Sequence, residues 1–478
     1  MLFNSIEFAI FLPIVFLLYW FVFNWNLKLQ NLFIVVVSYI FYGWWDWRFL
    51  FLIAFTSTCS FGAGLLIEKY RDTPRKAKAV NVVNIVLNLL ILGVFKYYDF
   101  FVTSFADAFL GGKTEGLLLK VILPVGISFY TFQALSYSID VYRGKLEPTR
   151  DIVQFFAFVS FFPQLVAGPI ERATNLLPQF GKPRTFVYEE GVDGLRQILW
   201  GLFKKMVVAD NCAIYVDKVF STYQTHSGST LLLAAVLFAF QIYGDFSGYS
   251  DIAIGTSKLF GIKLMRNFNV PYFSRDIAEF WRRWHISLTT WFRDYVYIPL
   301  GGSRCSKAKI IRNTFVIFLV SGFWHGANWT FIAWGGYHAL LFLPLILMGK
   351  NRKYRNTVAE GRLFPSFIEV GQMLLIFFLV TIGWIIFRAE SIGVVWDYFA
   401  HIFRPSFFSV PWLMTRLYYV PLCLSLFLCL LTEWINRDKS SPLAMSSSLV
   451  RVLFYLFLVG SIALFSVGSG NQFIYFQF

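Results

Sequence analysis

His325 lies in a segment whose residue types suit proton chemistry. It stands within residues 321–329, in a long run without charged side chains. Histidine holds or releases a proton near neutral pH, and a titratable side chain in an apolar span is a candidate functional group. If the segment were one helix, Ser321, Asn328 and Trp329 would share the face of His325, and its small residues would leave room for a ligand. The alternative is a buried histidine that hydrogen-bonds to a neighbouring helix.

A second histidine, His285, lies in an aromatic stripe over residues 275–295. The spacing predicts one amphipathic helix, with these residues along one side: Trp281, Trp284, His285, Leu288, Trp291, Phe292 and Tyr295. Glu279 is three and four residues from Arg282 and Arg283, which suits ion pairing. The helix is either an interfacial anchor or the wall of an active site, because His285 falls on its aromatic side.

The other three histidines are weaker candidates. On one continuous helix His338 would be rotated by about 220° from His325 and would point away from it. We therefore expect His338 to be a packing residue. His226 and His401 lie in segments typical of solvated loops.

Two carboxylates, Asp245 and Asp251, stand at the end of a long apolar run and need partners there. We favour structural pairing with nearby arginine over direct catalysis. The sequence has no Walker A, G-x-G-x-x-G, G-x-S-x-G or H-E-x-x-H motif, and its five cysteines have no zinc-site spacing. No metal and no bound cofactor are expected.

The composition determines which elements can position these side chains. Of 478 residues, 57% are hydrophobic, 20% aromatic and only 14% charged. An ordinary soluble domain is about 25% charged, so a soluble protein is excluded. We predict an all-α polytopic membrane protein with about 11–13 transmembrane or re-entrant helices and additional interfacial amphipathic helices. No linker is visible, so residues 1–478 are interpreted as one domain.

The net charge of +15 has a topological explanation. Basic residues concentrate in short loops at 69–78 and 350–355, and such loops face the cytoplasm. No nucleic-acid-binding motif accompanies the charge, so no nucleic-acid partner is expected. The lipid bilayer is the expected environment.

Residues 313–349 contain no Asp, Glu, Lys or Arg. As one helix they would be about 55 Å long, nearly twice the hydrocarbon thickness of about 30 Å. The sequence therefore predicts a broken or re-entrant hairpin, with Gly322, Gly326 and the pair at 335–336 as candidate breaks. Irregular backbone at membrane depth lies inside protein or beside a cavity, so we expect a cavity next to His325.

Six motifs follow one another at residues 124–132, 162–172, 245–251, 280–288, 299–303 and 323–330. In this order they resemble the membrane-bound O-acyltransferase (MBOAT) family, and most of all its bacterial branch, which acts in alginate O-acetylation. The motif-bearing core spans about 120–340. The resemblance implies a many-helix fold around a tunnel, in a bacterial cytoplasmic (inner) membrane.

The resemblance also implies an activity and a site. The family's catalytic histidine maps onto His325, and its second motif position maps onto His285. His325 would take the proton of a hydroxyl acceptor that attacks an acyl thioester. Asn328, tryptophan N–H groups or a protonated His285 would stabilise the oxyanion. The expected substrate-binding residues are Asn328, Trp324, Trp329, Ser321, Trp284, Asp245 and Arg283.

The implied reaction moves an acyl group, expected to be acetyl, from a cytoplasmic thioester such as acetyl-CoA to an exported polysaccharide. An SGNH-type or similar extracytoplasmic partner would complete the transfer. Coenzyme A phosphates would meet the segments 275–283 and 293–312, whose other interpretation is topology and lipid contact. Two alternative functions stay open: another acceptor, as in D-alanyl transfer or a lipid alcohol, and a transporter without chemistry.

Overall fold

The computed structural model describes residues 1–478 except 115, 440–442, 444–446, 467–472 and 475–478. Within the described residues all regular secondary structure is helical. The chain divides into two compact units, one of residues 1–195 and 253–265 and the other of residues 196–252 and 266–478. The interpretation of the whole chain as one domain stays a prediction.

The first unit holds the N-terminal helices. They are α1 (Ile6–Leu17), η1 (Leu18–Val22), α2 (Leu27–Gly43), η2 (Trp47–Phe49), α3 (Leu50–Lys69), α4 (Pro74–Leu92), η3 (Gly93–Tyr97), α5 (Tyr98–Phe109), α6 (Ile127–Tyr142), α7 (Ile152–Ser160), α8 (Phe162–Leu165), α9 (Ala173–Phe180) and the first half of α10 (Tyr188–Leu202).

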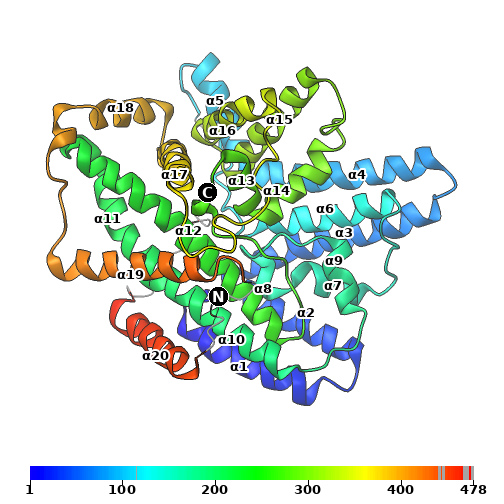
Figure 1. Cartoon of the computed structure of the whole chain (residues 1–478). Helices are drawn as coiled ribbons and strands as arrows, with labels where there is room; N and C mark the ends of the chain where they lie inside the picture. The colour runs from blue at the N-terminus through cyan, green and yellow to red at the C-terminus, as the bar shows by residue number, and fades with distance from the viewer. Residues whose placement is uncertain (115, 440–442, 444–446, 467–472, 475–478) are drawn as a thin grey trace. The chain divides into compact units, whose positions relative to one another are not determined.

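Helices α3, α4 and α6 pack against one another, as Figure 1 shows. A buried amide ties them together: Asn84 on α4 donates to the Ser138 hydroxyl on α6 (2.9 Å) and accepts from the Ser60 hydroxyl on α3 (3.4 Å). Because a buried polar group costs stability unless it is hydrogen-bonded, this network specifies how the three helices meet.

The second unit holds the remaining helices, and α12 also contributes its last turns to the first unit. They are η4 (Phe203–Ala209), α11 (Asp210–Ser221), η5 (Tyr223–Thr225), α12 (Gly228–Leu259), η6 (Pro271–Phe273), α13 (Ile277–Arg283), α14 (Ile286–Phe292), η7 (Arg293–Tyr297), α15 (Lys307–His325), α16 (Trp329–Leu347), α17 (Phe367–Arg388), α18 (Ile392–Ile402), η8 (Pro405–Phe408), α19 (Arg416–Ile435) and α20 (Ser448–Phe465).

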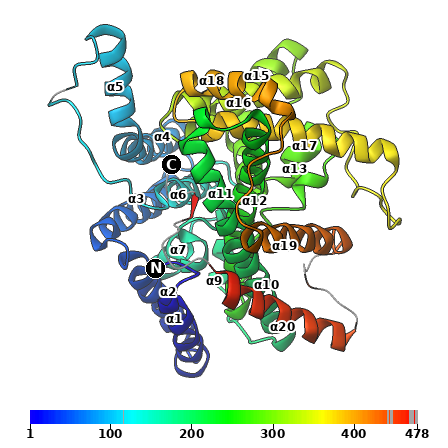
Figure 2. The same cartoon turned by 90° about the vertical axis from the view of Figure 1, so that its left-hand side faces the viewer.

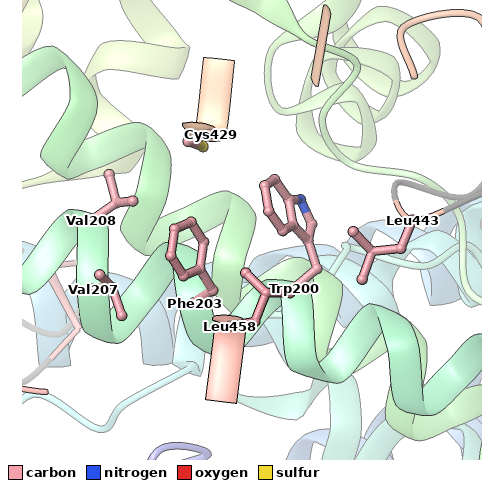
Figure 3. Packing of buried hydrophobic residues seen from close by; sticks show 7 residues of the cluster. All are labelled: Trp200, Phe203, Val207, Val208, Cys429, Leu443 and Leu458. Carbon is pink, nitrogen blue, oxygen red and sulfur yellow. The ribbon is translucent and has the colours of Figure 1, made fainter. Parts of the chain in front are cut away.

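Helices α19 and α20 both pack against η4, and Figure 2 shows them from a second side. A buried cluster lies where they meet, and Figure 3 shows its members: Trp200, Phe203, Val207, Val208, Cys429, Leu443 and Leu458. The rings of Trp200 and Phe203 stack at 5.5 Å between centroids. Burial of large apolar side chains is the main stabilising term here, so the C-terminal helices are part of the core of the second unit.

Seven helical segments in the described part of the chain are long and apolar enough to cross a membrane. They are Trp47–Lys69, Pro74–Phe109, Gly228–Leu259, Trp329–Leu347, Phe367–Arg388, Arg416–Ile435 and Ser448–Phe465, with shorter apolar segments at Ile6–Val22 and Leu27–Gly43. The predicted fold class, an all-α polytopic membrane protein, is confirmed.

The predicted break in the run at 313–349 is confirmed, and it lies at residues 326–328, between α15 and α16. The two helices form a hairpin in which glycines allow close approach (Figure 1). A Cβ on Gly322 would lie 2.2 Å from the Phe331 carbonyl oxygen, and one on Gly335 would lie 2.3 Å from that of Phe318. Of the candidate breaks, Gly326 is therefore the break, whereas Gly322 and Gly335 are packing positions.

Candidate active site

His325 is the last residue of α15, and Asn328 begins the next helix as the N-cap of α16. The prediction that Ser321, Asn328 and Trp329 share one helical face with His325 is therefore wrong, because the helix ends before it reaches Asn328. Ser321 keeps its predicted place one turn before His325. The break also removes the rotation argument for His338.

The second predicted helix is interrupted at the other histidine. Helix α13 ends at Arg283 and α14 begins at Ile286, with Trp284 extended and His285 in the left-handed region at φ 43°. The prediction of one continuous helix over 275–295 is wrong, and so the single aromatic stripe is divided at Trp284. The cause is a competing partner from another segment: the backbone N–H groups of Ile286 and Ser287 bond to Asn267 instead of to their own helix (2.8 and 3.3 Å).

The two histidines meet the same indole ring. The ring centroid of Trp324 lies 4.9 Å from that of His325 and 6.0 Å from that of His285. Both imidazoles are buried, with 5% and 1% of their residue surface exposed. The structure thus brings His285 next to Trp324 and His325, two predicted site residues that lie about 40 positions later in the sequence.

Further aromatic rings complete the wall around His325. Trp334 on α16 lies 5.1 Å from His325 and 4.9 Å from His338, and Phe387 on α17 lies 5.4 Å from His325. The indole N–H of Trp334 has no hydrogen-bond partner among the described residues. A buried polar group in this state marks a place for a ligand or an ordered water. The wall is apolar with a few polar atoms, as in small-molecule sites.

Asn328 and Trp329 have different surroundings from the histidines. The Asn328 amide oxygen accepts from the Thr330 N–H (3.0 Å), and its N–H₂ group donates to the Glu390 carbonyl (2.8 Å). Asn328 thus caps α16 and ties the hairpin turn to the end of α17. Trp329 is 55% exposed. The structure does not bring Trp329 into the buried ring cluster.

Two predicted substrate-binding residues take part in buried ion pairs. Arg283 contacts Glu279 (2.9 Å) and donates to the Asn356 carbonyl (3.1 Å). Asp245 pairs with Lys205 (2.5 Å). The predicted structural pairing of Asp245 is present, but its partner is a lysine and not an arginine.

Trp284 is fully buried, and its ring lies 4.9 Å from that of Trp384 on α17. Trp384 lies in turn 5.9 Å from Trp334, the ring that contacts His325. The predicted residue Trp284 therefore packs against Trp384, which in turn contacts Trp334.

A cavity of about 520 Å³ lies in the second unit beside the α15–α16 hairpin. Four arginines line it: Arg282, Arg293, Arg352 and Arg355. Apart from Asn351, its remaining wall is aromatic, aliphatic or hydroxyl-bearing, and it includes Trp281, Phe318 and Ser321. Ser321 precedes His325 by one helical turn, but neither His325 nor His285 is among the residues that line the cavity. A cavity therefore lies beside this hairpin, whereas a cavity next to His325 itself stays a prediction.

Comparisons with known proteins identify the family. The model of the MBOAT, membrane-bound O-acyltransferase, family matches residues 146–379. The probable alginate O-acetylase AlgI of Pseudomonas putida is 36% identical over the full length of both chains. This chain belongs to the membrane-bound O-acyltransferase family.

Other relatives differ in their acceptors. The peptidoglycan O-acetyltransferase of Helicobacter pylori is 35% identical over 82% of this chain and 78% of its own. The teichoic acid D-alanyltransferase of Bacillus subtilis is 31% identical over 49% of this chain and 62% of its own. Together with the apolar helices, these similarities identify a multi-pass O-acyltransferase of the bacterial cytoplasmic membrane, as the sequence predicted.

The matched region includes both histidines; it begins at residue 146, inside the predicted core of 120–340, and extends past the end of that core to residue 379. Sequence reasoning missed Asn267, Trp334, Trp384 and Phe387. Trp384 and Phe387 lie outside the six motifs, and Asn267 lies before the motif at 280–288, so no motif pointed to them. Among the described residues no group of three or more His, Cys, Asp or Glu side chains could hold a metal ion.

Proposed function

We propose that this acyltransferase moves an acetyl group from a cytoplasmic thioester donor toward an exported polysaccharide, with His325 as general base. The observation that carries the proposal is the arginine-lined cavity whose wall includes Ser321, one helical turn before His325. Arg352 and Arg355 belong to the loop that positive-inside bias assigns to the cytoplasm. The phosphates of acetyl-CoA would meet these arginines, and the thioester would extend along α15 toward Ser321.

The length of the hairpin supports transfer across the bilayer. Helix α16 has 19 residues and is therefore about 28 Å long, close to the hydrocarbon thickness of about 30 Å, and it is one of the segments apolar enough to cross a membrane. It begins directly after the turn at 326–328 that follows His325, and it ends before the basic loop at 350–355. With the donor at the basic loop, the turn would be at the other side of the membrane, and the acceptor would approach His325 there.

The reaction follows from the residue types. His325 accepts the proton of the acceptor hydroxyl while the hydroxyl oxygen attacks the thioester carbonyl. Asn328, the Trp324 N–H or a protonated His285 donates to the oxyanion that forms. The carbon–sulfur bond then breaks, and the departing thiolate takes a proton. The acetyl group is left on the acceptor oxygen.

A separate extracytoplasmic acyltransferase of the SGNH type would receive the acyl group and complete transfer to the polymer. A second class of reaction is D-alanyl transfer to an envelope polymer, which the similarity to the teichoic acid D-alanyltransferase favours. The donor separates the two classes: acetyl-CoA for one, an aminoacyl carrier protein for the other.

The test is release of coenzyme A from acetyl-CoA by the purified protein in nanodiscs, with and without polysaccharide and partner. His325→Ala and His285→Ala are measured beside the wild type, with His226→Gln as a control. We expect turnover to fall by at least about 10³-fold in His325→Ala and to be unchanged in His226→Gln. Wild-type turnover by a folded His325→Ala protein would contradict the proposal.

A further inference from the structure

We propose that Asn267 is a positioning residue that holds His285 in the tautomer with its proton on Nδ1, so that proton exchange occurs at Nε2. This inference rests on the proposed role of His285 in acyl transfer. Asn267 lies between α12 and η6 and is fully buried. No sequence motif had marked it.

Asn267 contacts the interrupted helix through both of its oxygens. Its main-chain carbonyl accepts the Ile286 N–H at 2.8 Å. Its side-chain Oδ1 accepts the Ser287 N–H at 3.3 Å and the Ser287 hydroxyl at 2.9 Å. On the other side, Nδ2 donates to the Ser250 hydroxyl at 3.0 Å. The amide therefore joins α12 to the start of α14.

These contacts determine which way the amide faces. A backbone N–H can only donate, so the atom that meets the Ser287 N–H must be the amide oxygen. That oxygen also lies 3.1 Å from Nδ1 of His285, and an amide oxygen can only accept. The Ser287 hydroxyl also lies 3.4 Å from Nδ1, but it donates its one proton to Oδ1 at 2.9 Å. Nδ1 therefore carries a proton, and in the neutral ring the lone pair is on Nε2.

The same bond persists when the ring is charged. The imidazolium has protons on both nitrogens, so Nδ1 continues to donate to Asn267 in either state. Uptake and release of a proton then take place at Nε2 alone. This arrangement lets His285 donate from Nε2 to an oxyanion when protonated and accept there when neutral, without reorientation of the ring.

Asn267 also stabilises the backbone conformation that carries His285. A left-handed conformation is strained at a non-glycine residue, and His285 has φ 43°. The bonds from Asn267 to residues 286 and 287 lie directly after this turn and offset that strain. One side chain thus fixes both the direction of the ring and its tautomer.

The experiment measures the pH dependence of turnover for Asn267→Asp, Asn267→Leu and the control Asn269→Leu, which changes the same loop. Asn267→Asp keeps the acceptor and adds a negative charge next to Nδ1. We expect its activity to stay within about 10-fold of wild type, and the pH midpoint of turnover to move upward by about one unit or more. Asn267→Leu removes the acceptor and should lower kcat by about 10–100-fold with little change in the KM for the donor. Asn269→Leu should match wild type.

An unshifted pH midpoint in Asn267→Asp would overturn the inference, and so would wild-type kcat in a folded Asn267→Leu protein. If Asn267→Leu does not fold, the pH profile of Asn267→Asp still decides. His285→Ala, measured in parallel, separates this inference from the proposed function. Wild-type turnover in His285→Ala would refute the role of His285 itself, whereas an inactive His285→Ala with wild-type Asn267 variants would refute only the positioning role.

Discussion

The imidazole of His285 lies 6.0 Å from the indole of Trp324, the residue directly before His325. A single ring therefore contacts both histidines, since Trp324 and His325 are 4.9 Å apart. This relationship places an indole N–H donor next to the proposed base. It leads to a test of the oxyanion assignment that changes neither histidine.

Trp324→Phe keeps an aromatic ring in the wall and removes its N–H. If this group donates to the oxyanion, kcat should fall by about 10²-fold, the usual effect of removing one such donor. Steady-state turnover of acetyl-CoA measures the effect, and thermal unfolding checks the fold. Trp396→Phe changes an exposed residue of α18 and serves as the matched control. Equal kcat in the two variants would remove Trp324 from the donors.

Asn328 needs a variant that separates capping from catalysis. Serine caps helices about as well as asparagine, so Asn328→Ser should keep the bond to the Thr330 N–H and change stability by less than about 1 kcal/mol. It removes the amide donor, and kcat should fall by about 10²-fold if that donor meets the oxyanion. Kinetics and thermal unfolding in the same detergent distinguish the two roles. Unchanged kcat would leave Asn328 with the cap alone.

The basic residues near the cavity divide into two groups that the sequence could not separate. Arg352 and Arg355 line the cavity, whereas Arg304 and Lys307 do not. The double variant Arg352→Glu, Arg355→Glu should raise the KM for acetyl-CoA by about 10-fold or more, because each reversal replaces an attraction to phosphate with a repulsion. The double variant Arg304→Glu, Lys307→Glu carries the same charge change and should leave KM near wild type. The reverse pattern would move donor entry to the 293–312 segment.

The sequence predicted those parts of the fold that depend on composition and local pattern. Low charge and long apolar runs were enough for an all-helical membrane protein. The length of the run at 313–349 was enough for a hairpin, because a single helix does not fit the bilayer. The place of Ser321, one helical turn before His325, followed from the same run.

The sequence did not predict the features that depend on tertiary contacts. The residues at 275–295 have the periodicity of one helix, yet α13 and α14 are separated at His285, where Asn267 competes for the backbone N–H groups. Arg283 was predicted to bind substrate, and its contacts with Glu279 and Asn356 could not be read from the sequence of one helix. Spacing along one helix contains no information about a competing partner from another segment.

The buried carboxyl of Glu171 in the first unit should make the free energy of unfolding depend on pH. It lies in the loop between α8 and α9, and burial raises its pKa from 4.5 to about 7, although Asn175 (2.7 Å) and the Met265 N–H donate to it. The folded state then binds more protons than the unfolded state between these values. The free energy of unfolding should therefore decrease as the pH rises from about 4.5 to about 7.

Glu171→Gln should remove this dependence and should be more stable than wild type at pH 8, where the wild-type carboxyl is ionised. Thermal unfolding between pH 5 and pH 8 measures this pH dependence. Glu189→Gln, at an exposed position, is the control. A wild-type midpoint that rises with pH over this range would contradict the assignment.

The close packing of the α15–α16 hairpin, which carries His325, should depend on Gly322 and Gly335 and not on Gly336. A Cβ on Gly335 would lie 2.3 Å from the Phe318 carbonyl oxygen, too close for any real contact, whereas one on Gly336 would lie 3.8 Å from Leu319 Cδ2. Gly335→Ala, like Gly322→Ala, must therefore push the two helices apart, at a cost of about 1–3 kcal/mol or more. Gly336→Ala should be neutral or slightly stabilising, because alanine favours helix. The adjacent pair is compared by thermal unfolding and by turnover. Since α15 ends at His325, Gly335→Ala should also lower kcat. Equal stability of Gly335→Ala and Gly336→Ala would show that the helices are less tightly packed than this geometry requires.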